Sequence, residues 1–144
     1  MSDKALSCVL LADRHHGLAE GIRGLLETAF DTVVMVADEA SLLEGASRLQ
    51  PEVAVVDLSL AQDSGLGWLR ALRASSPGLR VIVLSVHDEQ AVRGAAMDAG
   101  ADAFVLKRAI ATDLLPAVEF VRGSHNAGAS MSERLKAVDS GLHD

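Results

Sequence analysis

The 144-residue sequence predicts an α/β domain built on an open, doubly wound, five-stranded parallel sheet. Short β-branched apolar runs alternate with segments whose apolar residues recur at helical spacing, which is typical of repeated strand–helix units. Four of the five apolar runs lack polar–apolar alternation, as expected of strands covered on both faces. A closed barrel is excluded because it needs eight such units and about 250 residues.

Each expected element follows from its own residues. The runs with the length and composition of strands are Leu6–Ala12, Thr32–Ala37, Val53–Val56, Arg80–Val86 and Ala103–Leu106. The helical segments carry these apolar stripes in chain order: Leu18, Ile22, Leu25 and Leu26; Leu42, Leu43, Ala46 and Leu49; Leu66, Leu69 and Leu72; Val92, Ala95, Ala96 and Ala99; Leu114, Leu115, Val118 and Val121. Pro51, Pro77-Gly78 and Gly100 end the second, third and fourth helices.

Residues 1–122 are expected to form one domain, and residues 123–144 a linker or C-terminal tail. The stretch Gly123–Ser130 has the small, polar composition of a flexible linker. Ser130 or Ser132 can cap a short helix after it. Within the domain, Trp68 is expected at the surface of the third helix.

Composition narrows the class of protein. No apolar run approaches the roughly 20 residues of a membrane span, and the first residues lack the pattern of a secretory signal. Cys8 is the only cysteine, so an internal disulfide is excluded. A net charge of −7 with 3% aromatic residues disfavours binding to nucleic acid. We expect a cytoplasmic domain without direct membrane or nucleic-acid binding.

Polar residues stand at the carboxyl ends of four expected strands. Asp13 follows the first strand, Asp57 the third, Ser85 ends the fourth and Lys107 follows the fifth. In an open α/β sheet, ligands bind outside the carboxyl ends of the strands, so these side chains are expected to converge on one edge.

Two carboxylates, a hydroxyl and an ammonium group suit phosphoryl transfer. A carboxylate can attack phosphorus, and positive charge must neutralise the phosphoryl oxygens. Asp57 is the expected nucleophile, because it directly follows a buried strand and heads the loop Leu58–Ser64. A divalent cation held by carboxylates, with Lys107 and Ser85 on the remaining oxygens, would complete the site.

The chain contains five motifs in order: Val9–His15, Ala19–Glu27, Val55–Leu60, Val83–Asp88 and Gly100–Lys107. Together they resemble the receiver domains of response regulators, the CheY-like phosphoacceptor modules of two-component signalling, with the greatest similarity to the NarL/LuxR class. The resemblance covers roughly residues 6–122, which makes it more specific than a single short pattern. It implies the flavodoxin/CheY-like fold with strand order 2-1-3-4-5.

The resemblance also implies roles for individual residues. Asp57 would accept a phosphoryl group from a histidine kinase, Lys107 would pair with the phosphate, and Ser85 would hydrogen-bond it. Phe104 would be the switch aromatic. Mg²⁺ would be held by Asp13, Asp57 and the backbone carbonyl of Ser59.

Such a domain is a regulatory switch, with no enzymatic activity beyond its own phosphorylation and dephosphorylation. Phosphorylation would alter a surface formed by the fourth helix, the fifth strand and the fifth helix. Homodimerisation through that surface and control of a DNA-binding output domain absent from this chain are the implied consequences.

Two residues depart from the family's pattern. Arg14 stands where the family carries a second metal-binding acid, and Ala61 stands where it usually has proline. A cation in the pocket opposes a bound dication, so weakened Mg²⁺ binding is expected. Arg14 can enter the pocket in place of the metal, turn to solvent, or mark a degenerate pseudo-receiver that acts as a phosphate-independent interaction module.

The same residues also have simpler structural interpretations, and two other functions are disfavoured. Asp57 can cap a turn, Ser85 can be an ordinary strand-end serine, and His15 and His16 are expected only to begin a helix. A haloacid-dehalogenase-like phosphatase is disfavoured because Ser59 stands where its general acid would be. A flavodoxin-like nucleotide module is disfavoured because Asp13 would repel phosphate.

Overall fold

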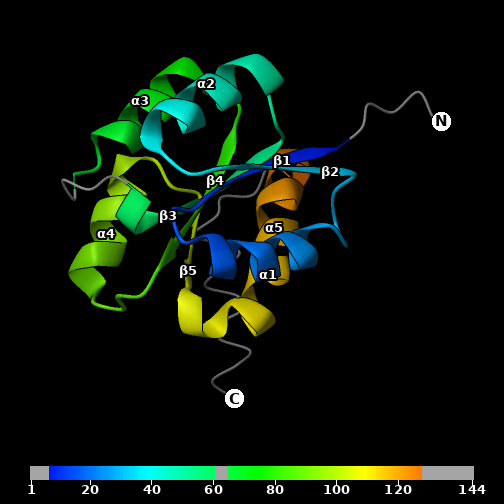
Figure 1. Cartoon of the computed structure of the whole chain (residues 1–144). Helices are drawn as coiled ribbons and strands as arrows, with labels where there is room; N and C mark the ends of the chain where they lie inside the picture. The colour runs from blue at the N-terminus through cyan, green and yellow to red at the C-terminus, as the bar shows by residue number, and fades with distance from the viewer. Residues whose placement is uncertain (1–6, 61–64, 128–144) are drawn as a thin grey trace.

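A computed structural model describes residues 7–60 and 65–127. Its five parallel strands form one sheet in the order β2-β1-β3-β4-β5 (Figure 1), which confirms the predicted fold class and strand order. The strands are β1 (Cys8–Ala12), β2 (Thr32–Val36), β3 (Val53–Asp57), β4 (Arg80–Ser85) and β5 (Ala103–Leu106). Each lies within a residue or two of its predicted bounds.

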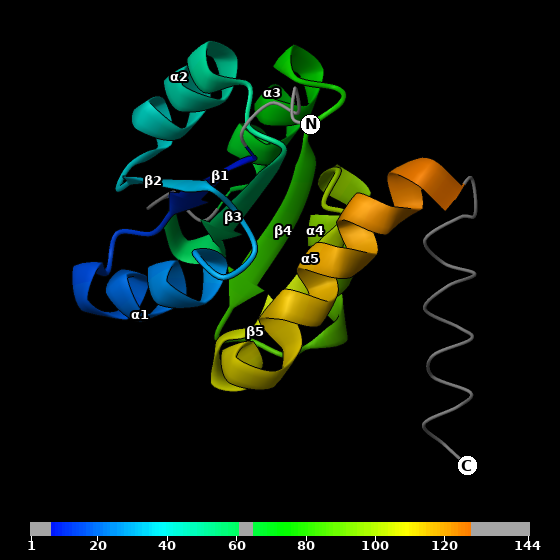
Figure 2. The ribbon, with the colours of Figure 1, turned by 90° about the vertical axis from the view of Figure 1, so that its right-hand side faces the viewer.

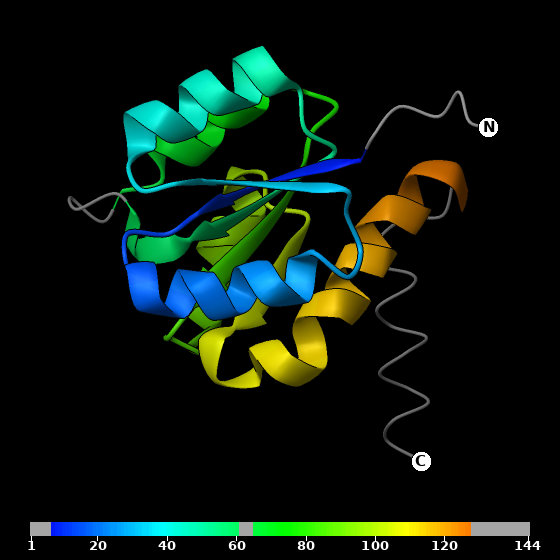
Figure 3. The same cartoon turned by 45° about the vertical axis from the view of Figure 1, so that its right-hand side comes forward.

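Five α-helices cover the two faces of the sheet. They are α1 (His16–Leu26), α2 (Glu39–Leu49), α3 (Gly67–Ser75), α4 (Gln90–Ala99) and α5 (Ile110–Ala127). Helices α2, α3 and α4 pack on one face, and α1 and α5 pack side by side on the other (Figures 1 and 3). Figure 2 shows α5 against β4 and β5. No helix in the described part of the chain is long and apolar enough to cross a bilayer.

Alternate strand residues belong to two separate cores. In β1, Leu10 packs toward α2 and α3, whereas Val9 and Leu11 pack toward α1 and α5. In β3 all five residues are buried. Burial on both faces explains why these strands are continuously apolar, since neither face contacts water.

Trp68 is buried, with 2% of its surface exposed, so its predicted surface position is wrong. Helix α3 packs against α2 on one side and α4 on the other, as well as against the sheet. A helix enclosed from three directions buries a wider arc than the Leu66, Leu69, Leu72 stripe alone defines, and Trp68 falls within that arc.

Helix α5 runs to Ala127, beyond the predicted domain boundary at residue 122. Residues 123–127 of the expected linker are therefore helical, because a formed helix propagates at little cost and Val121 anchors α5 in the core; the domain boundary itself stays a prediction. The rest of the expected tail, residues 128–144, and the loop position Ala61 lie outside the described residues.

The Arg73 side chain joins α3 to the loop between α4 and β5. Its guanidinium donates to the carbonyl of Gly100 at 2.7 Å and to Asp102 Oδ2 at 2.6 Å, and also to the carbonyls of Pro77 and Leu79. The planar fork of arginine suits several acceptors at once. One half-buried side chain thus links α3, the segment before β4 and the segment before β5, on the side of the sheet where the strands begin.

Gly100 ends α4 with φ of 122°, a backbone conformation that favours glycine. A Cβ atom there would also lie 3.3 Å from the Arg73 side chain. The helix end and the arginine contact therefore depend on the same glycine.

We predict that Arg73→Ala lowers the free energy of unfolding by about 2–3 kcal/mol, since it removes the Asp102 ion pair and the donor to several carbonyls, while the Val81 N–H still donates to Asp102. Urea denaturation measures the effect. Arg48→Ala is the control, because Arg48 makes only an exposed pair with Glu44 at 3.4 Å. That variant should change stability by less than about 0.5 kcal/mol. Equal losses in both variants would contradict the role given to Arg73.

Candidate functional site

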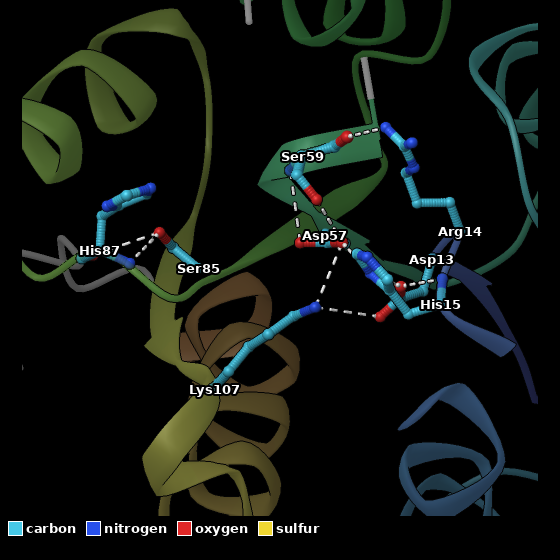
Figure 4. A network of polar contacts seen from close by, with 8 residues as sticks. All are labelled: Asp13, Arg14, His15, Asp57, Ser59, Ser85, His87 and Lys107. Atoms are coloured by element: carbon cyan, nitrogen blue, oxygen red, sulfur yellow. Dashed lines mark hydrogen bonds and ion pairs between the residues drawn. The ribbon is translucent and has the colours of Figure 1, made fainter. Parts of the chain in front are cut away.

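Two buried carboxylates meet at the carboxyl ends of β1 and β3. Asp13 directly follows β1 and Asp57 is the last residue of β3, and these strands are neighbours in the sheet. Asp13 is 4% exposed and Asp57 is 2% exposed. Parallel pairing therefore brings two like charges together in a region from which water is largely excluded (Figure 4).

Lys107 supplies the opposing charge. It is the first residue after β5, and its Nζ lies 3.2 Å from Asp57 Oδ2 and 3.4 Å from Asp13 Oδ2. Because β4 lies between β3 and β5, the side chain must extend past the end of β4 to reach the carboxylates. Its side chain is only 9% exposed, so the ion pairs are poorly screened by solvent.

Ser59 holds Asp57 from the other side. Its hydroxyl donates to Asp57 Oδ2 at 2.8 Å, and its backbone N–H donates to Oδ1 at 3.3 Å. Burial by itself raises the pKa of Asp57, but the Ser59 hydroxyl, the Lys107 charge and the Ser59 N–H outweigh it and leave the pKa below its usual value. Asp57 is thus ionised at neutral pH, as a nucleophile must be.

His15 also reaches the carboxylates, which sequence reasoning missed. Its Nδ1 lies 3.3 Å from Asp13 Oδ1 and 3.5 Å from Asp57 Oδ2. The residue does begin α1, as its N-cap, but its ring turns into the site rather than capping the helix. The backbone N–H of His15 donates to Asp13 Oδ1 at 2.8 Å, a local turn that a sequence reading could have inferred from Asp13.

Arg14 extends along the rim of the site. Its Nη1 donates to the backbone carbonyl of Ser59 at 3.4 Å, while the side chain remains exposed (Figure 4). That carbonyl is the one expected to bind a metal. The guanidinium therefore lies beside the pocket, against one of the oxygens that a cation would use.

Ser85 and Phe104 are buried, but they contact other groups. The Ser85 hydroxyl accepts from the backbone N–H of His87 at 2.9 Å and donates to its carbonyl at 3.2 Å, facing away from Asp57 (Figure 4). Phe104 is 8% exposed, with the Arg93 guanidinium 4.9 Å above its ring. The Ser85 hydroxyl therefore lies on the pocket wall, hydrogen-bonded to the His87 backbone rather than to the Asp57 carboxylate.

A cavity of about 600 Å³ opens over these residues. Arg14, His15, Asp57 and Lys107 line its polar side, and Ser85 lies on its wall. The remaining lining comes mostly from apolar residues of the neighbouring loops and α4: Leu58, Leu66, Val86, Ala91, Val92 and Ala95. The pocket therefore offers Asp57 to a ligand from outside while its floor stays buried.

The donor set fits a divalent cation. The carboxylates of Asp13 and Asp57 and the carbonyl of Ser59 are hard oxygen ligands of the kind that Mg²⁺ prefers. Lys107 lies against both carboxylates and Arg14 against the carbonyl, so two cations oppose the metal's charge. These residues can hold the ion, with lower affinity than an all-acidic pocket would have.

Sequence reasoning correctly brought Asp13, Asp57 and Lys107 together. It also placed Ser85 at the pocket, although its hydroxyl is engaged elsewhere. It missed the His15 imidazole and gave Ser59 only a backbone role. Both omissions concern side-chain direction in loops, for which apolar periodicity carries no signal.

Known proteins are similar to this chain in sequence and in fold. The response regulator receiver domain model matches residues 9–119. The nitrate/nitrite response regulator NarP of Escherichia coli K12 is 34% identical over 129 residues, which cover 88% of this chain and 59% of NarP. This chain spans between 49% and 63% of the lengths of four curated relatives, three nitrate/nitrite response regulators and one transcriptional regulatory protein.

Two solved structures extend the comparison. A two-component response regulator of the LuxR family from Aurantimonas sp. SI85-9A1 is similar with a TM-score of 0.74 at 26% identity, covering 83% of this chain and 87% of that one. RcsB from Salmonella enterica serovar Typhimurium, bound to promoter rprA in the presence of the phosphomimetic BeF₃⁻, is similar with a TM-score of 0.68 at 29% identity. That match covers 78% of this chain and 66% of RcsB.

The matched model covers most of the sheet and all the polar groups at its carboxyl edge. The chain therefore belongs to the response regulator receiver domain family, and its relatives place it in the NarL/LuxR class of two-component regulators.

Proposed function

We propose that this domain accepts a phosphoryl group on Asp57 from a histidine kinase and thereby switches its contacts with other proteins. The supporting observation is the buried Asp57 carboxylate, kept ionised 3.2 Å from the Lys107 ammonium and facing an open cavity. Nucleophile, counter-charge and access are the three requirements of phosphoryl transfer to a carboxylate.

Asp57, Lys107 and Ser59 each have a role in the proposed phosphoryl transfer. A carboxylate oxygen of Asp57 attacks the phosphorus of the donor, the new P–O bond forms as the P–N bond to the kinase histidine breaks, and the histidine retains the electron pair. Lys107 remains beside the acyl phosphate and neutralises part of its charge. The Ser59 hydroxyl, which donates to Asp57 Oδ2 in this structure, orients the carboxylate.

Mg²⁺ bound by Asp13, Asp57 and the Ser59 carbonyl would supply charge neutralisation at the phosphoryl oxygens. Arg14 lies against the Ser59 carbonyl, so it competes with the ion for one ligand. Arg14 would accordingly lower the affinity of the pocket for the metal.

The switch would involve Ser85 and Phe104. The Ser85 hydroxyl leaves the His87 backbone to hydrogen-bond the phosphoryl group, and the loop that follows β4 moves with it. That loop leads directly into α4, and Arg93 of α4 lies over the Phe104 ring, so the surface of α4, β5 and α5 would change. Sedimentation with and without BeF₃⁻ tests whether the chain dimerises through this surface; an unchanged mass would exclude it.

A DNA-binding output is the proposed target of the switch, since the similar RcsB is solved on promoter DNA and this chain spans only part of its relatives. The net charge of −7 argues against DNA contact by the receiver itself. We propose the cytoplasm as its compartment. Fractionation of cells that contain the tagged protein would test that assignment, and recovery with membranes or secreted material would contradict it.

One observation favours a second function. The Arg14 contact with the Ser59 carbonyl is compatible with a pseudo-receiver that binds partners without metal or phosphate. In that case Asp13, Asp57 and Lys107 would serve only to stabilise the fold. Phosphorylation and metal binding separate the two functions.

We predict that acetyl phosphate with Mg²⁺ adds one phosphoryl group to the protein, measured by intact mass. Asp57→Asn should abolish the adduct, because the amide is a poor nucleophile. Asp98→Asn is the matched control, since Asp98 is an exposed carboxylate of α4, and it should leave the adduct unchanged. Absence of any adduct, both with acetyl phosphate and with a cognate kinase, would leave only the pseudo-receiver function.

We predict that Arg14→Asp strengthens Mg²⁺ binding by about tenfold or more, because it replaces an opposing charge with a ligand beside the metal site. Calorimetric titration measures the dissociation constant. Arg48→Asp makes the same change in net charge on the exposed surface of α2 and should have little effect. Equal strengthening in both variants would show that Arg14 acts only through overall charge.

A further inference from the structure

The His15 imidazole has no task in the phosphoryl transfer described above, yet it lies against both carboxylates. Asp13, His15 and Asp57 each offer one ligand atom, and these atoms all lie within 4.8 Å of one another. The group combines two oxygen donors with one nitrogen donor. His15 and Asp57 line the cavity, so an ion from solvent can reach the group from that side.

The spacing of the ligand atoms matches a shared cation. Two atoms each about 2.1 Å from one metal lie about 3.0 Å apart in octahedral and about 3.4 Å apart in tetrahedral geometry. His15 Nδ1 lies 3.3 Å from Asp13 Oδ1 and 3.5 Å from Asp57 Oδ2. The two distances from His15 Nδ1 are thus close to those of atoms that share one metal, and the two carboxylate oxygens lie within 4.8 Å of each other.

The two oxygens of Asp13 face different partners. Oδ2 faces the Lys107 ammonium at 3.4 Å, whereas Oδ1 faces the His15 ring and accepts the His15 backbone N–H. A cation at Oδ1 would therefore leave the Asp13–Lys107 contact in place, while at Asp57 it would share Oδ2 with the Lys107 ammonium at 3.2 Å and the Ser59 hydroxyl at 2.8 Å. The same backbone hydrogen bond fixes where the His15 side chain begins, so the imidazole is positioned by the carboxylate with which it would share the metal.

We propose that His15 is a metal ligand and that Asp13, His15 and Asp57 give this pocket a preference for a first-row transition cation such as Mn²⁺, Co²⁺ or Zn²⁺ over Mg²⁺. Imidazole nitrogen suits those ions, whereas Mg²⁺ selects oxygen ligands. The Ser59 carbonyl, an oxygen ligand that Mg²⁺ would need, is engaged by Arg14. The importance of the ion for signalling rests on the proposed function, but its binding does not require phosphorylation.

Calorimetric titration of the unphosphorylated full chain with Zn²⁺, Mn²⁺ and Mg²⁺ tests the proposal. Transition cations bind most N/O sites more tightly than Mg²⁺, so the wild-type preference alone decides nothing. The decisive result is the effect of His15→Ala. It should weaken Zn²⁺ and Mn²⁺ binding by about tenfold or more, with Mg²⁺ affinity unchanged or higher.

His87→Ala is the matched control, because the exposed His87 ring lines the far side of the same cavity beside Glu89. It should leave the binding of all three ions unchanged. Equal Zn²⁺ affinity in the wild type and in His15→Ala would overturn the proposal, as would a loss of the same size in His87→Ala.

Nitrogen NMR of the imidazole rings gives a second, direct readout. The sequence has five histidines, so the ring signals can be assigned by substitution. Zn²⁺ should shift the Nδ1 signal of His15 to the metal-bound range in the wild type. An unshifted His15 ring at saturating Zn²⁺ would exclude coordination, whatever the calorimetry shows.

The two proposals fail in different ways. Phosphorylation of Asp57 with a His15 ring that never binds metal would overturn this inference and leave the receiver function intact. Metal binding through His15 in a chain that no phosphodonor modifies would uphold this inference and overturn the receiver function.

Discussion

The structure depends on keeping two buried carboxylates neutralised at one edge of a parallel sheet. Asp13 and Asp57 are side by side because β1 and β3 are adjacent, and both have lost nearly all contact with water. Burying one charge without a partner costs several kcal/mol, and burying two like charges together costs more. Lys107 offsets this cost from two strands away, so the order of the sheet itself assembles the site.

The parts of the molecule that follow from burial were predictable from the sequence. The continuous apolar run Val53–Val56 indicated a strand covered on both faces, and β3 is buried along its whole length. The carboxyl ends of parallel strands lie on the same side of a sheet. The prediction of parallel strands was therefore enough to predict that Asp13, Asp57 and Lys107 lie close together. Backbone topology, in other words, decided the positions of these three groups.

The remaining features depend on contacts between distant segments. The His15 ring lies between Asp13, two residues before it, and Asp57, 42 residues after it; the turn at Asp13 is local, but the contact with Asp57 exists only in the folded sheet. Trp68 was misplaced because its burial comes from helices on both sides of α3. The end of α5 was misjudged for the opposite reason, since a linker-like composition after Gly123 did not stop a helix already anchored by the core.

The Arg73 contacts have a mechanical consequence for α4. They fasten the carbonyl of Gly100, at the C-terminal end of the helix, where Ala96 and Ala99 are also buried. The buried residues of α4 lie toward that C-terminal end, whereas Gln90 and Ala91 at the opposite end are exposed and Ala91 lines the cavity over Asp57. Helix α4 is thus anchored by Arg73 at its C-terminal end, while its N-terminal end borders the cavity beside Asp57. A rotation of the helix about its anchored end would move the N-terminal end most, so a ligand that enters the cavity meets the part of α4 with the greatest lever arm.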